Sequence, residues 1–167
     1  LQTVTVGAVN LLFTLVAIGT VDLVGRKPLM IVGSAGMGLA LTGLGLVAYL
    51  GQTSAWVLLF ILGYIACFAL AVGPVTWVIL SEIYPTKIRG RALSIATFCL
   101  WISNYLVSQT FPMMDEHPGL IARFHGGFPF LVYAAFCAVL VGVVMLLVPE
   151  TKGQSLEEIE RLWSRND

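Results

Sequence analysis

Charged side chains are scarce in this sequence. Its 167 residues include nine Lys and Arg and nine Asp and Glu, so 11% are charged and 58% are hydrophobic. An ordinary soluble domain is roughly 25% charged. A chain of this length cannot bury so much apolar surface in a water-soluble core, which indicates that a lipid bilayer is its solvent. The formal net charge is zero, so the composition gives no reason to expect a nucleic-acid partner.

Groups for acid–base chemistry are absent from the middle of the apolar runs, where no Asp, Glu, Lys, Arg or His occurs. A membrane-embedded enzyme would need such side chains there, so the sequence predicts that the protein is not an enzyme. Cys67, Cys99 and Cys137 lie inside apolar runs without metal-ligand spacing, and we expect buried thiols rather than a zinc site or disulfides. No phosphate-binding glycine loop occurs, and we expect no cofactor.

Long apolar runs without charged residues make up most of the sequence. Residues 28–81 contain no charge, and a spanning helix needs only about 20 apolar residues, so this run can cross a bilayer twice. Runs 1–21, 92–114 and 126–149 are each long enough for one crossing. The sequence therefore predicts an all-α membrane protein with five transmembrane helices. We place them at residues 1–21, 28–50, 55–81, 92–111 and 127–148.

The basic residues give these spans an orientation, because Lys and Arg near span ends mark the cytoplasmic side. They follow the first, third and fifth spans, whereas the alternate connections hold only Arg123. Leu1 is then outside, residues 1–149 form the transmembrane bundle, and residues 150–167 form a separate cytoplasmic tail. The odd number of crossings, and a first residue that is not Met, predict a piece of a longer protein. The residues that set the orientation are Arg26, Lys27, Lys87, Arg89, Arg91, Lys152, Arg161 and Arg165.

Two segments outside the spans carry local signals. In the tail, Ser155 and Glu158 form a capping box, and an apolar stripe follows, so we expect a short amphipathic helix under the membrane. The outer loop 112–126 contains His117 and His125, which we expect to be solvated rather than bound to metal.

Two predicted spans carry narrow polar stripes. Lipid cannot satisfy a polar side chain, so such residues face another helix or a water-filled cavity. Either hydrogen bonds between helices or a shared aqueous cavity would explain them, and the likeness of the two stripes favours the cavity. In the second span Ser34, Gly38 and Thr42 instead predict close helix packing. The stripes comprise Thr3, Gly7, Asn10 and Thr14 in the first span, and Thr97, Trp101, Asn104 and Ser108 in the fourth.

The third predicted span contains Gly73-Pro74, and a proline removes a backbone donor and clashes with the preceding turn. A bent or broken helix is expected there. In transporters such a discontinuity can expose backbone groups to a substrate, although a plain proline kink is the simpler alternative. Trp77 lies one turn beyond, and an aromatic face suits the C–H groups of a sugar ring.

Four motifs in order resemble the sugar porters of the major facilitator superfamily. The resemblance covers the whole chain as spans eight to twelve of twelve, which belong to the carboxyl-terminal bundle. It implies that this bundle and an amino-terminal bundle line a central monosaccharide cavity and rock against each other. The motifs are Asp22-Leu-Val-Gly25-Arg26-Lys27, Gly73-Pro74-Val-Thr-Trp77, Ser81-Glu82-Ile-Tyr-Pro85 with Arg89-Gly90-Arg91-Ala92, and Pro149-Glu150-Thr151-Lys152-Gly153.

The resemblance also implies residue roles. Trp77 would stack on the sugar, and Gly73 would offer its backbone. Phe68 would close the site, although it lies nine residues before Trp77 and so on the opposite face of an ideal helix. Asn10 and Asn104 would bond hydroxyls, with Trp101 beside them. On the inner face, Asp22, Arg26, Glu82, Arg89 and Glu150 would form a charge network that latches the outward-open state.

The sequence departs from the family pattern at one position. Leu100 stands where the sugar porters for xylose and glucose look to carry an amide side chain, so we expect this protein to prefer a different sugar or to bind its sugar more weakly.

The implied function is transport of a xylose-like or glucose-like monosaccharide by proton symport and alternating access. The alternatives are a sugar sensor and a facilitated-diffusion carrier without proton coupling. The implied partners are the sugar, the bilayer and the amino-terminal bundle.

Overall fold

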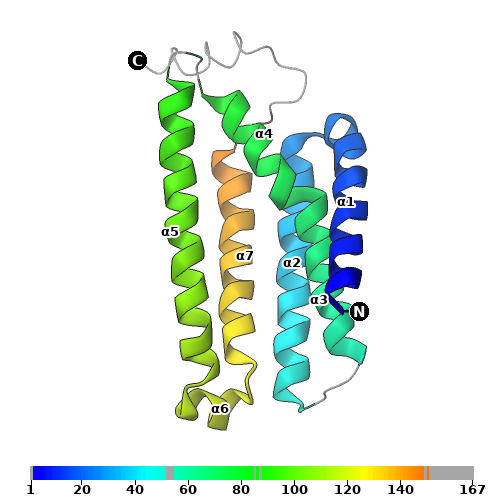
Figure 1. Cartoon of the computed structure of the whole chain (residues 1–167), viewed down its shortest axis with the longest axis vertical. Coiled ribbons are helices and arrows are strands. Elements are labelled where there is room, and N and C mark those ends of the chain that lie inside the picture. The colour runs from blue at the N-terminus through cyan, green and yellow to red at the C-terminus, as the bar shows by residue number, and fades with distance from the viewer. Residues whose placement is uncertain (1, 52–54, 85, 87, 149, 151–167) are drawn as a thin grey trace.

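A computed structural model describes residues 2–51, 55–84, 86, 88–148 and 150 (Figure 1). Every regular element among these described residues is helical, in agreement with the predicted all-α class. The elements are α1 (Gln2–Val24), α2 (Arg26–Tyr49), α3 (Ala55–Cys67), the π-helical turn η1 (Phe68–Val72), α4 (Gly73–Ile83), α5 (Arg89–Asp115), α6 (Pro118–Phe124) and α7 (Phe128–Leu147). The predicted tail helix, with Ser155 and Glu158, lies outside the described residues.

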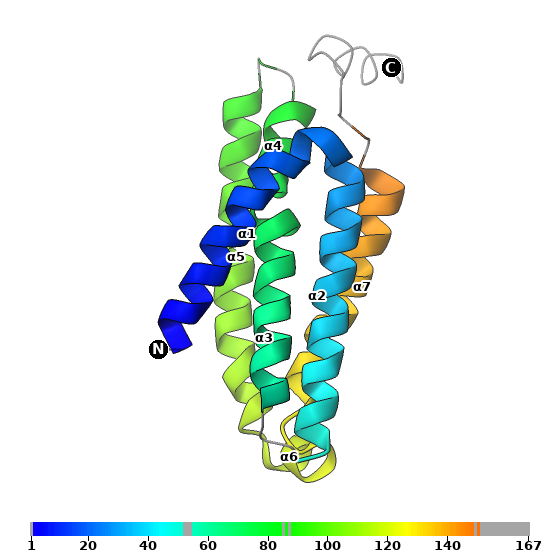
Figure 2. The same cartoon turned by 90° about the vertical axis from the view of Figure 1, so that its right-hand side faces the viewer.

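Four helical segments are long and apolar enough to cross a membrane, namely Thr3–Val24, Arg26–Tyr49, Trp56–Ile83 and Phe128–Leu147. The third combines α3, η1 and α4. Helix α5 is 27 residues long and runs beside α7 through the height of the molecule (Figures 1 and 2). It is also the least apolar of the long helices, because it carries the second polar stripe. Four of the five predicted spans are therefore confirmed by length and composition, and the fourth, at residues 92–111, remains a prediction.

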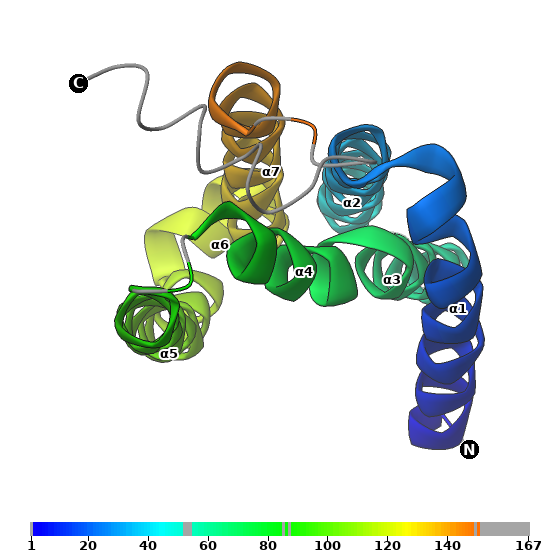
Figure 3. The same ribbon diagram turned by 90° about the horizontal axis from the view of Figure 1, so that it is seen from above.

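The helices form two layers when viewed along the bundle axis (Figure 3). Helices α1, α3–α4 and α5 lie in one layer, with α3–α4 in the middle, and α2 and α7 form the other. The main buried cluster joins Met30 of α2, Val75 of α4 and Val144 of α7, and a second contains Met37, Leu41 and Cys137. Both clusters involve the α2–α7 layer, so α1 and α5 remain at the edges of the bundle.

Glycines allow α2 and α7 to approach closely. A Cβ atom on Gly38 would lie 3.3 Å from Cys137 Cβ, and one on Gly45 would lie 3.0 Å from Leu131 Cδ2. Ser34 on the same helix is fully buried, and its hydroxyl donates to Met30 O at 2.7 Å. The prediction that Ser34 and Gly38 mark a packing face is confirmed.

The helix interruption expected at Gly73-Pro74 is a widened turn. In η1 the Gly73 N–H donates to Phe68 O, five residues back. In an α-helix the Pro74 ring would clash with the carbonyl four residues earlier, and the wider π turn accommodates it without breaking the helix. The discontinuity therefore lies just before Gly73 rather than at Pro74.

The outer connection differs from the predicted loop 112–126. Helix α5 continues past the expected end at Phe111 to Asp115, with Pro112 inside it, and α6 follows at Pro118. His117 begins α6, since its Nδ1 accepts the Gly119 N–H at 3.2 Å. His125 ends α6 in the left-handed conformation, with φ 50°. Both histidines are exposed, as predicted, but each also shapes the backbone. The loop prediction was wrong because these local caps were not recognised.

Candidate functional site

The six residues expected to contact a sugar all belong to one layer. Asn10 lies on α1, Phe68 on η1, Gly73 and Trp77 on α4, and Trp101 and Asn104 on α5. Figure 3 shows these elements as adjacent columns, with α3–α4 between α1 and α5.

The large aromatic side chains among them are exposed. Trp77 is 45% exposed, Trp101 66% and Phe68 39%. Both asparagines are also exposed. These polar and aromatic groups are therefore not used to pack the described helices together.

The π turn resolves the angular problem raised by Phe68 and Trp77. Nine residues of an ideal helix at about 100° per residue place two side chains about 180° apart. A π turn adds one extra residue to a helical turn, which takes about 100° from the count. The angle between the Phe68 and Trp77 side chains around the helix axis therefore falls to about 80°. A Cβ on Gly73 would lie 3.2 Å from Phe68 Cε1, so the Phe68 ring lies beside this glycine. Phe68, Gly73 and Trp77 can thus serve one surface.

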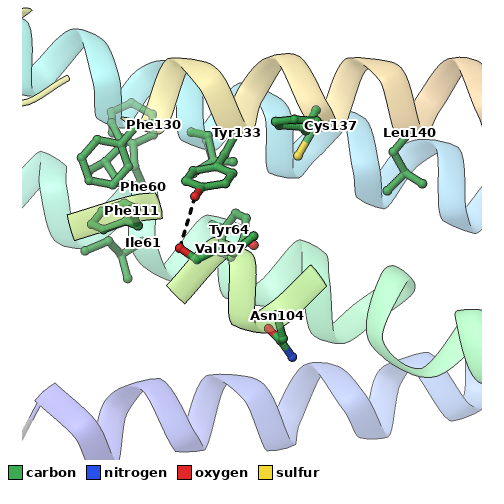
Figure 4. A pocket seen from close by; sticks show the side chains of 14 residues that line it. Phe60, Ile61, Tyr64, Asn104, Val107, Phe111, Phe130, Tyr133, Cys137 and Leu140 are labelled. Carbon is green, nitrogen blue, oxygen red and sulfur yellow. Dashed lines mark hydrogen bonds between the residues drawn. The ribbon is translucent and has the colours of Figure 1, made fainter. Parts of the chain in front are cut away.

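A pocket of about 530 Å³ lies between α2, α3, α5 and α7 (Figure 4). Its lining is mainly aromatic and aliphatic, and the Tyr133 hydroxyl donates to Val107 O at 3.5 Å. Among the six expected sugar contacts only Asn104 lines it, and its amide points away from Tyr133 and Cys137. The other five residues, Trp77 and Asn10 among them, therefore lie outside this pocket.

Two hydroxyls of the polar stripes bond within their own helices. Thr14 Oγ1 donates to Asn10 O and Thr97 Oγ1 to Leu93 O, both at 2.8 Å. Such bonds satisfy a hydroxyl locally in a membrane helix. The amides of Asn10 and Asn104 are consequently the groups of these stripes best suited to bond an external hydroxyl.

A charge cluster, predicted for the inner face, lies where α1 and α4 end and α2 begins. Arg26 Nη2 lies 3.0 Å from Glu82 Oε1 and 3.2 Å from Asp22 Oδ1. The side chains of Arg26 and Glu82 are only 15% and 24% exposed, whereas Asp22 is 75% exposed. The Arg26–Glu82 pair is thus the shielded portion of the cluster, where solvent screens the interaction least.

Glu150 joins this cluster through the backbone of α2. Its Oε1 accepts the Arg26 N–H at 3.1 Å, and its Oε2 accepts the Lys27 N–H at 3.2 Å. The role of Lys27 was missed by sequence reasoning, which used this residue only to orient the chain. No sequence signal could reveal the cap, because its acceptor lies 124 residues away from Arg26.

Two guanidinium groups, Arg26 in this cluster and Arg89 at the start of α5, each have one buried nitrogen without a partner among the described residues. Arg89 Nε donates to Tyr84 O at 3.3 Å, which ties the start of α5 to the end of α4. Arg89 Nη2 and Arg26 Nε are buried without a hydrogen-bond partner among the described residues. A buried donor of a charged group is costly to leave unpaired, so both atoms are suited to an acceptor from outside these residues.

Comparison with known proteins gives a consistent result. A family model described as "Sugar (and other) transporter" matches residues 1–163. The chain is 49% identical to the D-xylose-proton symporter of Escherichia coli K12, over 98% of this chain and 33% of that protein. It is 43% identical to the glucose facilitated diffusion protein of Zymomonas mobilis, over 98% of this chain and 34% of the other. The chain spans about a third of the length of the curated relatives it matches.

Solved structures match equally well. The structure of the proton:xylose symporter XylE bound to 6-bromo-6-deoxy-D-glucose gives a TM-score of 0.88 at 49% identity, covering 97% of this chain and 34% of that one. The inward-open conformation of XylE from E. coli also gives 0.88, at 47% identity and covering 98% and 35%. The arrangement of helices in this chain therefore resembles both structures to the same extent.

Proposed function

The chain belongs to the sugar transporter family, whose members are multi-pass membrane proteins and not enzymes, and on this basis we propose that it forms spans eight to twelve of a twelve-helix monosaccharide transporter. The whole protein works by alternating access, with the sugar bound between two bundles near the middle of the membrane. The five spans of this chain supply one side of that site, and an amino-terminal bundle supplies the other.

One observation carries the proposal: exposed aromatic and amide groups from three neighbouring elements lie in a single layer. Trp77 provides a face for the sugar ring, and Asn10 and Asn104 provide amides for hydroxyls. Trp101 lies one turn from Asn104, and Phe68 lies beside Gly73. A bundle held only by lipid contacts would have no reason to present amides from two separate helices, because lipid cannot satisfy them.

The inner cluster provides the latch between the bundles. Arg26 contacts Asp22, Glu82 and, through its backbone, Glu150. Arg89, which bonds Tyr84 O at the end of α4, is the fifth member that we assign to the latch. The buried donors Arg26 Nε and Arg89 Nη2 bond acceptors of the amino-terminal bundle when the inner side is closed. Opening the inner side exchanges these acceptors for water. The orientation follows from the basic residues, with Leu1 outside and residue 150 at the cytoplasmic face.

Proton symport is the coupling we propose. The relatives include proton symporters for xylose and arabinose and one facilitated-diffusion protein for glucose. The described spans carry no acidic residue at mid-depth, so the coupling carboxylate belongs to the amino-terminal bundle. A facilitated-diffusion carrier or a sugar sensor is the alternative.

Uptake of labelled xylose and glucose into proteoliposomes that contain the full-length protein tests this function. We expect accumulation against a gradient when the outside is more acidic than the inside. Equilibration without accumulation would indicate facilitated diffusion. Sugar binding without any uptake would indicate a sensor and would contradict transport.

A further inference from the structure

The first turn of α2 receives its cap from the far end of the described chain. The first four N–H groups of any helix lack partners within the helix. Here the two oxygens of the Glu150 carboxylate accept the N–H groups of Arg26 and Lys27, the first two residues of α2. A negative group at this point also interacts favourably with the helix dipole.

Gly25, which precedes α2, is shaped to admit that carboxylate. Its backbone has φ 103° and ψ 157°, a region that is essentially restricted to glycine. A Cβ at this position would lie 2.9 Å from Glu150 Oε2 and 3.2 Å from Glu150 Cδ. Any other residue here would be strained and would also displace the carboxylate.

The end of α7 is also bonded to the start of α2. Lys27 Nζ donates to Met145 O, in the last turn of α7, at 2.8 Å. The start of α2 therefore caps the end of α7, while the segment that follows α7 caps the start of α2. This reciprocal contact fixes both helix ends relative to each other.

We infer that Glu150 and Gly25 are positioning residues for Arg26: the carboxylate fixes the first residue of α2, and this holds the Arg26 guanidinium 3.0 Å from Glu82. The inference rests on the proposed function, in which Arg26 and Glu82 belong to the latch. In this role Glu150 acts within its own bundle, and its hydrogen bonds to α2 persist whether the two bundles are open or closed on the inner side. Arg26 and Glu82 are then the members of the group that exchange partners.

Amide hydrogen exchange of the full-length transporter in lipid nanodiscs tests the cap directly. Glu150→Ala should accelerate exchange at the Arg26, Lys27 and Leu29 amides about fivefold, as loss of a typical cap does, and leave the centre of α2 unchanged; Pro28 has no amide hydrogen. Gly25→Ala should have the same local effect. Gly51→Ala is the matched control, because Gly51 also has a positive φ of 66° but no atom within 4 Å of its added Cβ. Unchanged exchange at the Arg26, Lys27 and Leu29 amides in Glu150→Ala would overturn the inference.

A double-mutant comparison of uptake rates tests the link to Arg26. Glu150→Ala should slow uptake about fivefold in the native background but less than twofold when Arg26→Gln is already present, because both changes remove the same interaction. Equal slowing in both backgrounds would contradict a positioning role. Sugar affinity of the native protein is measured alongside. If the native protein binds no sugar the proposed function fails, whereas the exchange result still decides the cap.

Discussion

Single residues divide into those that bond locally and those that remain available. The hydroxyls of Thr14 and Thr97 bond carbonyls one turn back in their own helices, and Asn10 and Asn104 present exposed amides. The sequence predicted both stripes from their spacing. It could not separate the members that satisfy themselves from those that can bind, because that depends on side-chain rotamers.

Replacing either asparagine tests this division. Asn10→Ala and Asn104→Ala should each weaken sugar binding about tenfold, the loss expected for a hydrogen bond to a buried ligand. Equilibrium binding of labelled sugar to the purified full-length protein measures the effect. Ser103→Ala is the control, since its hydroxyl donates to Cys99 O within α5 and should leave affinity unchanged. Native affinity in both asparagine variants would remove these residues from the site.

Leu100 offers a gain-of-function test. Leu100→Gln should tighten xylose binding, because it restores an amide next to Trp101 that can pair with a hydroxyl otherwise left without a protein partner. The same substitution at Leu106, which lines the groove between α5 and α7, is the control. Unchanged or weaker xylose binding by Leu100→Gln would refute the role of this position in sugar preference.

Among the elements, the pairing of α2 with α7 depends on close backbone approach. A Cβ on Gly127 would overlap the Gly45 carbonyl, whereas one on Gly63 of α3 would meet nothing within 4 Å. Gly127→Ala should therefore destabilise the protein by about 1–3 kcal/mol, as overpacking does. Gly63→Ala should be neutral or stabilising by up to about 1 kcal/mol, since alanine favours helix. Thermal unfolding of the full-length protein in detergent compares the two, and equal melting temperatures would contradict the proposed contact.

The π turn is the element that aligns Phe68 with Trp77. Deleting Leu70 should restore a continuous α-helix and return these side chains to opposite faces, so sugar binding should fall below detection. Leu70→Ala keeps the residue count and should bind sugar normally. Gel filtration and the far-ultraviolet circular dichroism spectrum establish that both variants are folded. Native affinity in the deletion variant would show that the π turn does not position the site.

For the whole molecule, the inner charge cluster should control the rate of the transport cycle more than sugar affinity. The Arg26–Glu82 pair is partly buried. Breaking it should therefore cost more free energy than breaking an exposed pair, about 0.2–1 kcal/mol, and less than breaking a fully buried one. Arg26→Gln should therefore slow uptake about tenfold and change sugar affinity less than about threefold. A variant whose affinity falls as much as its uptake would place Arg26 in the sugar site instead of the latch.

Sequence reasoning recovered the features of this fold that depend on local composition. The span predicted at residues 28–50 corresponds to α2 at Arg26–Tyr49, because an apolar run between two charges and a short polar stretch defines a membrane helix almost alone. It did not recover the continuation of α5 through Pro112, α6, or the cap made by Glu150. Each of these depends on contacts between residues that have no periodic relation, and the cap joins positions 124 residues apart.

That separation has a consequence for how the protein is made. The ribosome synthesises the start of α2 early, but the carboxylate that completes its first turn emerges only after α7 has been produced. A nascent or truncated chain that ends before Glu150 therefore displays two uncapped amides at this end of the bundle, beside the glycine whose nearest neighbours are atoms of that carboxylate. The hydrogen bonds between Glu150 and the start of α2 thus form only in a bundle in which α7 is packed against α2.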